Sequence, residues 1–97
     1  PTGKVTVHGT KINLEEQYLI MGLANEVGEF LGKCKKQMRG DGVTMDDKVG
    51  ELGDIFWYLA RLIDTYGLRH QDVLHANFVK LVDRKNRGVL KGDGDNR

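Results

Sequence analysis

The chain has 97 residues, the length of one small domain, and its 15 Lys and Arg residues nearly balance its 14 Asp and Glu residues. The net charge of +1 argues against a protein that binds nucleic-acid polymers, since such proteins usually carry a clear basic excess. The single cysteine excludes an intramolecular disulfide and a multi-cysteine metal site. No stretch approaches the roughly 20 apolar residues of a membrane span, and the first residues lack the apolar run of a signal peptide. We therefore expect a soluble cytoplasmic protein that does not bind membranes.

The first predicted elements are an N-terminal arm and a long helix. Residues 1–12 alternate only weakly between apolar and polar side chains, which predicts an extended arm. Asn13 is a suitable helix cap, and Glu16 follows three residues later as in a capping box. Apolar side chains then recur at helical spacing as far as Met38, and Gly40 should end this helix.

Two further helices are predicted before a short tail. Thr44 is the expected cap of the second helix, and Gly67 is its expected end. The third helix should cover residues 71–86, with Gly88 breaking it. We therefore predict an all-α fold with one helical domain over residues 13–88 and a flexible, Gly-rich basic tail over residues 89–97. A chain this short buries only about two-thirds of its unfolded surface, which favours a core shared with a second copy.

Two matched pairs of carboxylates are the most informative feature. Glu26 and Glu29 on the first helix, and Glu51 and Asp54 on the second, each have a spacing of three residues, so each pair shares one helix face. Both faces border the predicted apolar stripes, where unpaired charge is costly. A hard divalent cation would remove this conflict, and Mg²⁺ prefers carboxylate and water oxygens. The alternative is that both pairs are ordinary solvated surface.

Residues beside the acidic pairs carry weaker signals. Gly22 and Gly50 fall inside helices near the acidic faces, where a missing side chain would let a neighbouring helix or a ligand approach. Three other helical glycines are better explained by close helix packing, namely Gly28, Gly32 and Gly53. Trp57 and Tyr58 follow the second pair directly, and we interpret them as core or subunit-contact residues rather than as a base-stacking platform.

Basic and amide side chains near these pairs could hold phosphate groups. A metal site flanked by such groups suits a polyanionic ligand whose charge the metal alone cannot neutralise. The alternatives are a solvated helix flank and, for the tail, disorder. The candidate residues are Lys33 and Lys36 on the first helix, Asn77, Lys80 and Arg84 on the third, and Lys91 and Arg97 in the tail.

Together these motifs resemble the MazG-like, all-α nucleoside triphosphate pyrophosphohydrolases, a superfamily that also holds dimeric dUTPases and phosphoribosyl-ATP pyrophosphohydrolases. The segments 22–29 and 51–59 look like the two acidic motifs of that family. The stripe Asn77-x-x-Lys80-x-x-x-Arg84 resembles its nucleotide-contacting third helix, and the tail resembles the ending of phage and bacterial members. The resemblance covers about residues 14–97. Residues 1–12 depart from it, because members often begin with a further helix.

The resemblance implies Mg²⁺-dependent hydrolysis of an NTP or dNTP between its α and β phosphates, with Mn²⁺ as a substitute metal. The four carboxylates, Glu26, Glu29, Glu51 and Asp54, would bind the metal, and one of them would act as the general base. The seven basic and amide residues would position the substrate, with the tail closing as a lid. Members assemble as dimers or tetramers around a four-helix core. The alternatives are dUTP, dCTP or phosphoribosyl-ATP as substrate, or a non-enzymatic helical dimerisation or regulatory module.

Overall fold

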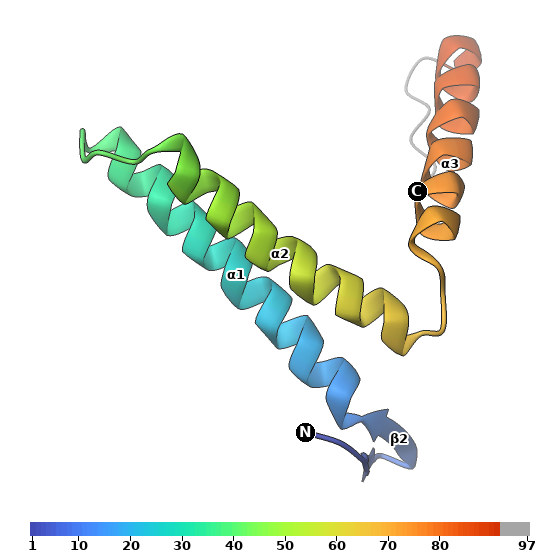
Figure 1. Cartoon of the computed structure of the whole chain (residues 1–97). Coiled ribbons are helices and arrows are strands. Elements are labelled where there is room, and N and C mark those ends of the chain that lie inside the picture. Colours follow the sequence, from blue (N-terminus) through green and yellow to red (C-terminus); the bar gives the residue numbers. More distant parts are fainter. Residues whose placement is uncertain (92–97) are drawn as a thin grey trace. The chain divides into compact units, whose positions relative to one another are not determined.

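The computed structural model describes residues 1–91, with side chains as far as residue 88. The chain divides after Gly67 into two compact units. The first unit contains a β-hairpin and helices α1 (Leu14–Met38) and α2 (Met45–Thr65), and the second contains helix α3 (His70–Lys91) (Figure 1). The predicted predominance of helix is thus confirmed for the described residues, and a small two-stranded sheet accompanies it.

The N-terminal arm is a hairpin and not a single extended segment. Strands β1 (Lys4–Val7) and β2 (Thr10–Asn13) pair antiparallel, with Val7 opposite Thr10. His8 and Gly9 form the turn with φ values of 50° and 77°. Two successive residues with positive φ are typical of the tight turns whose twist matches that of paired strands. The all-α prediction therefore fits the fold broadly, and the small two-stranded sheet within residues 4–13 is the departure from it.

Local signals set the ends of α1 as predicted. The side-chain oxygen of Asn13 accepts a hydrogen bond from the backbone N–H of Glu16 at 3.2 Å, which caps the first turn. At the other end, Gly40 has a φ of 86°, and its N–H donates to the carbonyl of Gln37. The N–H of Asp41 donates to the carbonyl of Lys36, which completes a Schellman motif.

Helix α2 also begins and ends where expected. The Thr44 hydroxyl accepts from the N–H of Asp47, and the Asp47 carboxylate accepts from the N–H of Thr44, so the capping box is complete. Hydrogen bonding of the Asp47 carboxylate to Thr44 is the main reason that the pKa of Asp47 falls below 3.8, and Lys33 and Lys36 add to the effect. Gly67 ends the helix in a left-handed conformation with a φ of 70°.

Helices α1 and α2 pack side by side in opposite directions and form the core of the first unit (Figure 1). Leu19 is the buried apolar residue at this contact, with 2% of its surface exposed. Half-buried apolar side chains are distributed along both helices, namely Leu23, Phe30, Ile55, Leu62 and Ile63. The Arg61 guanidinium also reaches across from α2 to the Glu15 carboxylate at 3.4 Å.

Many apolar side chains of α1 and α2 are exposed in this unit, including several that the sequence placed on a core stripe. On α2 they recur at alternating steps of four and three residues, the spacing of coiled-coil contacts, and on α1 they recur at steps of seven and four residues, which keep the same helix face. Each stripe is displaced by one residue, about 100°, from the contact between the helices. Because the helices are antiparallel, the two displacements place both stripes on the same side of the pair. This apolar face comprises Ile20, Val27, Leu31 and Met38 from α1 and Met45, Val49, Leu52, Phe56 and Leu59 from α2.

Helix α3 runs three residues beyond Gly88, so the prediction that this glycine breaks the helix was wrong. A single glycine in a helix costs only about 1 kcal/mol relative to alanine, and nearby helix-forming residues can offset it. Within residues 1–91, no helix has an apolar run sufficient to cross a membrane.

Candidate metal centre

Three of the four predicted carboxylates converge between α1 and α2. One carboxylate oxygen from each of Glu26, Glu51 and Asp54 lies within 4.8 Å of the others. The antiparallel packing brings them together, because Glu26 on α1 lies at the level of the Glu51–Asp54 turn of α2. We call these three residues the acidic triad. In the described part of the chain, it is the one group of acidic, histidine or cysteine residues with such spacing.

The surroundings of Glu26 disfavour the charged form of its carboxyl group. This side chain is half-buried between the helices, and partial burial is the main reason that its pKa rises above 4.5. The neighbouring charges of Asp54, Glu51 and Glu29 raise the pKa further. A bound cation would stabilise the charged form of this carboxylate by offsetting the repulsion from its neighbours, so the position is well suited to a cation.

The raised pKa predicts how stability depends on pH in the absence of metal. The folded protein binds a proton at Glu26 more tightly than the unfolded chain does, so stability falls as the pH rises from 4.5 through the raised value. Glu26→Gln removes this loss. In EDTA, the variant should therefore melt at a higher temperature than the wild type at about pH 7, and the difference should disappear below about pH 4. Circular dichroism melts across this range test the prediction, and a lower melting temperature for the variant at neutral pH would contradict it.

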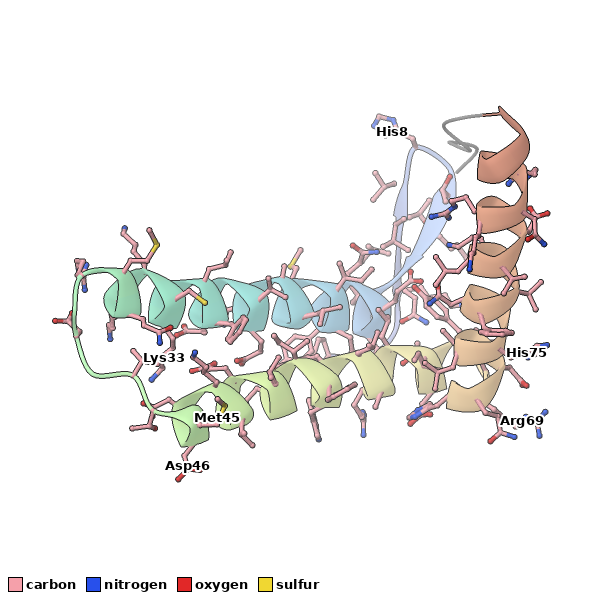
Figure 2. All side chains as sticks on the ribbon, turned by 90° about the horizontal axis from the view of Figure 1, so that it is seen from above. His8, Lys33, Met45, Asp46, Arg69 and His75 are labelled. Carbon is pink, nitrogen blue, oxygen red and sulfur yellow. The ribbon has the colours of Figure 1, made fainter. Side chains whose placement is uncertain are left out.

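The remaining predicted residues of the first unit lie further along α1 than Glu26. Glu29 is exposed one turn further along α1 and acts on Glu26 through its charge, but its oxygens lie outside the close group. Lys33 points from α1 toward α2 (Figure 2), and both it and Lys36 act electrostatically on Asp47. The two lysines therefore lie beyond the triad in the direction of the loop that joins the helices.

A tyrosine that the sequence analysis did not assign to the site lies on the other side of the triad. The ring of Tyr58 contacts the backbone at Gly22, at the position that a Cβ atom would occupy. Its hydroxyl is hydrogen-bonded to Tyr18, and partial burial, Tyr18, Glu26 and Asp54 all raise the pKa of Tyr58. The sequence spacing could have indicated that both residues lie close to the triad, because Gly22 and Tyr58 are each one helical turn from one of its members.

The helical glycines therefore differ from one another. The expected approach of a neighbouring helix is confirmed at Gly22. Added Cβ atoms at Gly28, Gly32, Gly50 and Gly53 would meet no atom of the described structure within 4 Å. Within the first unit, α1 and α2 do not pack closely at Gly28, Gly32 or Gly53, and packing of these glycines against another copy stays a prediction.

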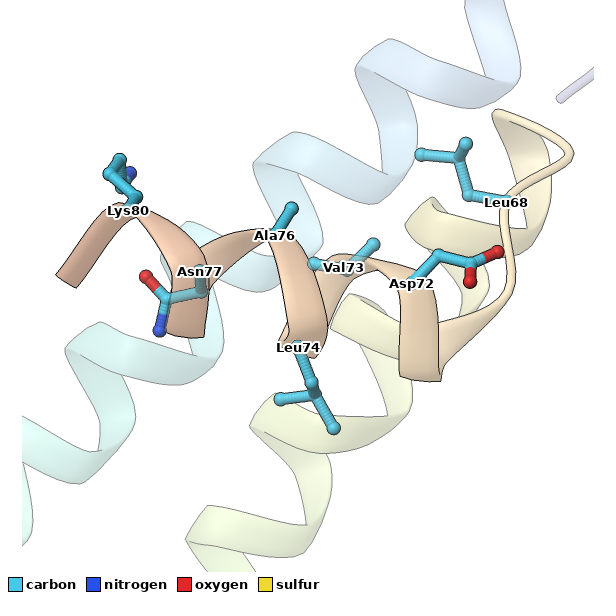
Figure 3. Close-up of a pocket in the computed structure, with 7 residues that line it drawn as sticks. All are labelled: Leu68, Asp72, Val73, Leu74, Ala76, Asn77 and Lys80. Atoms are coloured by element: carbon cyan, nitrogen blue, oxygen red, sulfur yellow. The ribbon is translucent and has the colours of Figure 1, made fainter. Parts of the chain in front are cut away.

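The predicted substrate residues of the second unit lie along α3. Asn77 and Lys80 line one open recess of this unit, beside mainly apolar neighbours (Figure 3). Arg84 is half-buried one turn further on and does not line the recess. The side chain of Lys91 and the whole of Arg97 lie outside the described residues.

Comparison with known proteins shows that this chain is similar in sequence to a phage protein. The Gene 37 protein of Mycobacterium phage L5 is 45% identical over 85 residues, and the match covers 82% of this chain and 75% of the phage protein. The chain belongs to the Gene 37 family. No family model matches the chain, and no solved structure matches it. The name of the L5 protein states no activity, so the triad is the feature of this member from which a function can be argued.

Proposed function

We propose that this protein is a Mg²⁺-dependent nucleotide pyrophosphohydrolase of the MazG-like type, which cleaves a nucleoside triphosphate into a monophosphate and pyrophosphate. The convergence of Glu26, Glu51 and Asp54 within 4.8 Å is the observation that carries the proposal. The resemblance of the two acidic motifs to those of the MazG-like enzymes gives the reaction. The name of the L5 protein adds no activity to this proposal.

The donor set suits a small hard cation. Carboxylate oxygens are the protein ligands that Mg²⁺ prefers, and this ion usually keeps several waters beside one or two carboxylates and the phosphates of its substrate. The triad would hold the metal, with Mn²⁺ as a substitute, and the exposed Glu29 would complete the set. Bound there, the metal would polarise phosphate oxygens and lower the pKa of an attacking water.

The other side chains of the site divide the remaining tasks. One glutamate of the acidic group would accept the proton of the attacking water. Attack at the α phosphorus breaks its bond to the bridging oxygen, and pyrophosphate leaves with that oxygen. Lys33 and Lys36 lie about two and three turns from Glu26 along α1, on the side of Asp47, and we propose that they neutralise negative charge of the phosphate chain.

A panel of nucleotides tests the proposal directly. We expect the purified protein to release pyrophosphate from at least one common NTP or dNTP with Mg²⁺ present, and none when EDTA is added. The panel should also contain dUTP, dCTP and phosphoribosyl-ATP, because these substrates are the alternatives within the same superfamily. A failure to release pyrophosphate from any of these compounds would contradict the proposed activity.

The assembly that we propose is a homodimer whose subunits share a four-helix core, with a tetramer as a dimer of such dimers. The exposed apolar face of α1 and α2 supports this, because the four-and-three spacing on α2 and the steps of seven and four on α1 are those of helices packed against other helices. A second copy presents the same face, so a two-fold axis would match apolar stripe to apolar stripe.

The same apolar face also favours a second candidate function, a non-enzymatic helical dimerisation module with solvated acidic residues. A Mg²⁺ titration followed by thermal unfolding distinguishes the two functions. A ligand that binds only the folded state must raise the melting temperature by mass action. The enzyme should therefore be stabilised by millimolar Mg²⁺, whereas the module should show no change beyond that caused by equal ionic strength of NaCl.

A further inference from the structure

Gly22 on α1 and Tyr58 on α2 each lie one helical turn from a member of the triad. Gly22 is four residues before Glu26 on α1, and Tyr58 is four residues after Asp54 on α2. Since residues four apart share a helix face, the Gly22–Tyr58 contact and the triad lie along the same seam between the helices, one turn apart. A change in helix separation at one level must therefore reach the other level.

The contact at this level is tight and its partners are constrained. A Cβ atom at residue 22 would overlap the body of the Tyr58 ring, so glycine at this position determines how closely the helices approach. The rings of Trp57 and Tyr58 pack edge to face, with centroids 5.0 Å apart and an interplanar angle of 86°. A side-chain hydrogen bond links Tyr58 to Tyr18 of α1. The Tyr58 ring therefore has neighbours on both helices.

We infer that the Gly22–Tyr58 contact sets the separation of α1 and α2 at the acidic triad and thereby makes the site selective for a small divalent cation. The physical basis is the difference in size and rigidity of the two common hard cations. Mg²⁺ requires oxygen ligands at about 2.0–2.1 Å in octahedral geometry, whereas Ca²⁺ accepts about 2.3–2.6 Å and more variable geometry. A wider site should therefore lose Mg²⁺ before it loses Ca²⁺. The inference rests on the proposed metal site.

Gly22→Ala is the direct test, with calorimetric titrations of Mg²⁺ and Ca²⁺ into the full-length metal-free protein. The added methyl group should force the helices apart and weaken Mg²⁺ binding at least about tenfold, the scale of changes at residues that support metal ligands. Ca²⁺ binding should weaken less, so that the ratio of the two affinities shifts toward Ca²⁺. Gly32→Ala is the matched control, because the same methyl on the same helix meets no described atom there. It should leave both affinities unchanged.

A second pair of variants separates spacing from folding. In the double variant Gly22→Ala with Tyr58→Leu, the smaller side chain makes room for the methyl group, and the Mg²⁺ affinity should return to within about threefold of the wild type. Tyr58→Phe keeps the ring and should preserve the affinity ratio, whereas Tyr58→Leu alone should change it. These two single variants decide the question even if Gly22→Ala does not fold.

Each result bears on a distinct part of the argument. Parallel losses of Mg²⁺ and Ca²⁺ in Gly22→Ala, or no recovery in the double variant, would overturn the inference while leaving the metal site in place. A change of the ratio in Tyr58→Phe that equals the change in Tyr58→Leu would assign the effect to the hydroxyl group, which also overturns it. No saturable Mg²⁺ binding to the wild type would overturn the proposed site and the inference together.

Discussion

Glu51→Gln should abolish pyrophosphate release while leaving the helical content of the protein unchanged. The substitution removes one negative charge and almost no volume from the triad, so the contact between α1 and α2 is retained. Changes at residues that merely support a metal ligand cost about 10–100-fold in affinity or activity, and loss of a ligand should cost at least the upper end of that range. Steady-state assays at saturating Mg²⁺, together with a Mg²⁺ titration of the variant, measure both effects.

Asp46→Asn provides the control for this experiment. Asp46 lies in the first turn of the same helix, and Figure 2 shows its side chain directed away from α1. Its loss also removes one negative charge, but at a position outside the triad. Activity should stay within about twofold of the wild type, since an exposed charge contributes little. Equal losses in the two variants would show that the net charge of the helix, and not the triad, supports the reaction.

The sequence predicted those features that depend on a few neighbouring residues. Asn13, Thr44 and Gly67 determine helix ends through hydrogen bonds or backbone conformations that each residue type favours locally, and the structure has them in these roles. The acidic pairs were also visible locally, because a spacing of three residues fixes a shared helix face. Their convergence could be anticipated only as a hypothesis, since it depends on the register of two helices.

The features that were missed depend on partners distant in the sequence or on weak turn signals. Tyr58 became a site residue only when the register placed its ring on Gly22, thirty-six positions earlier in the chain. The hairpin was missed because His8–Gly9 is a less distinctive turn than Asn–Gly, although both residues adopt the positive φ that such turns need. The apolar stripes were recognised, but a single helix gives no sign of whether an apolar side chain contacts its own chain or another copy.

Phe56→Glu should prevent the protein from forming its homodimer. Phe56 is 70% exposed in the single chain and lies within the apolar face, between Leu52 and Leu59 at steps of four and three residues. A symmetric dimer would bring this residue and its counterpart into the shared core. Burial of an unpaired carboxylate there costs several kcal/mol, and each 1.4 kcal/mol corresponds to about a tenfold change in the dissociation constant. Light scattering coupled to size exclusion should give a dimer or tetramer for the wild type and a monomer for the variant.

Met21→Glu is the matched comparison, because it introduces the same charge at a residue of nearly equal exposure. Met21 is 67% exposed on α1 but falls outside the apolar face, about 100° around the helix from Ile20 and about 120° from Val27. We expect this variant to keep the mass of the wild-type assembly. If Met21→Glu dissociates the protein and Phe56→Glu does not, the subunits associate through the opposite side of the helix pair. That side also carries Asp54 and Glu29, so the acidic site would then be formed at the contact between subunits.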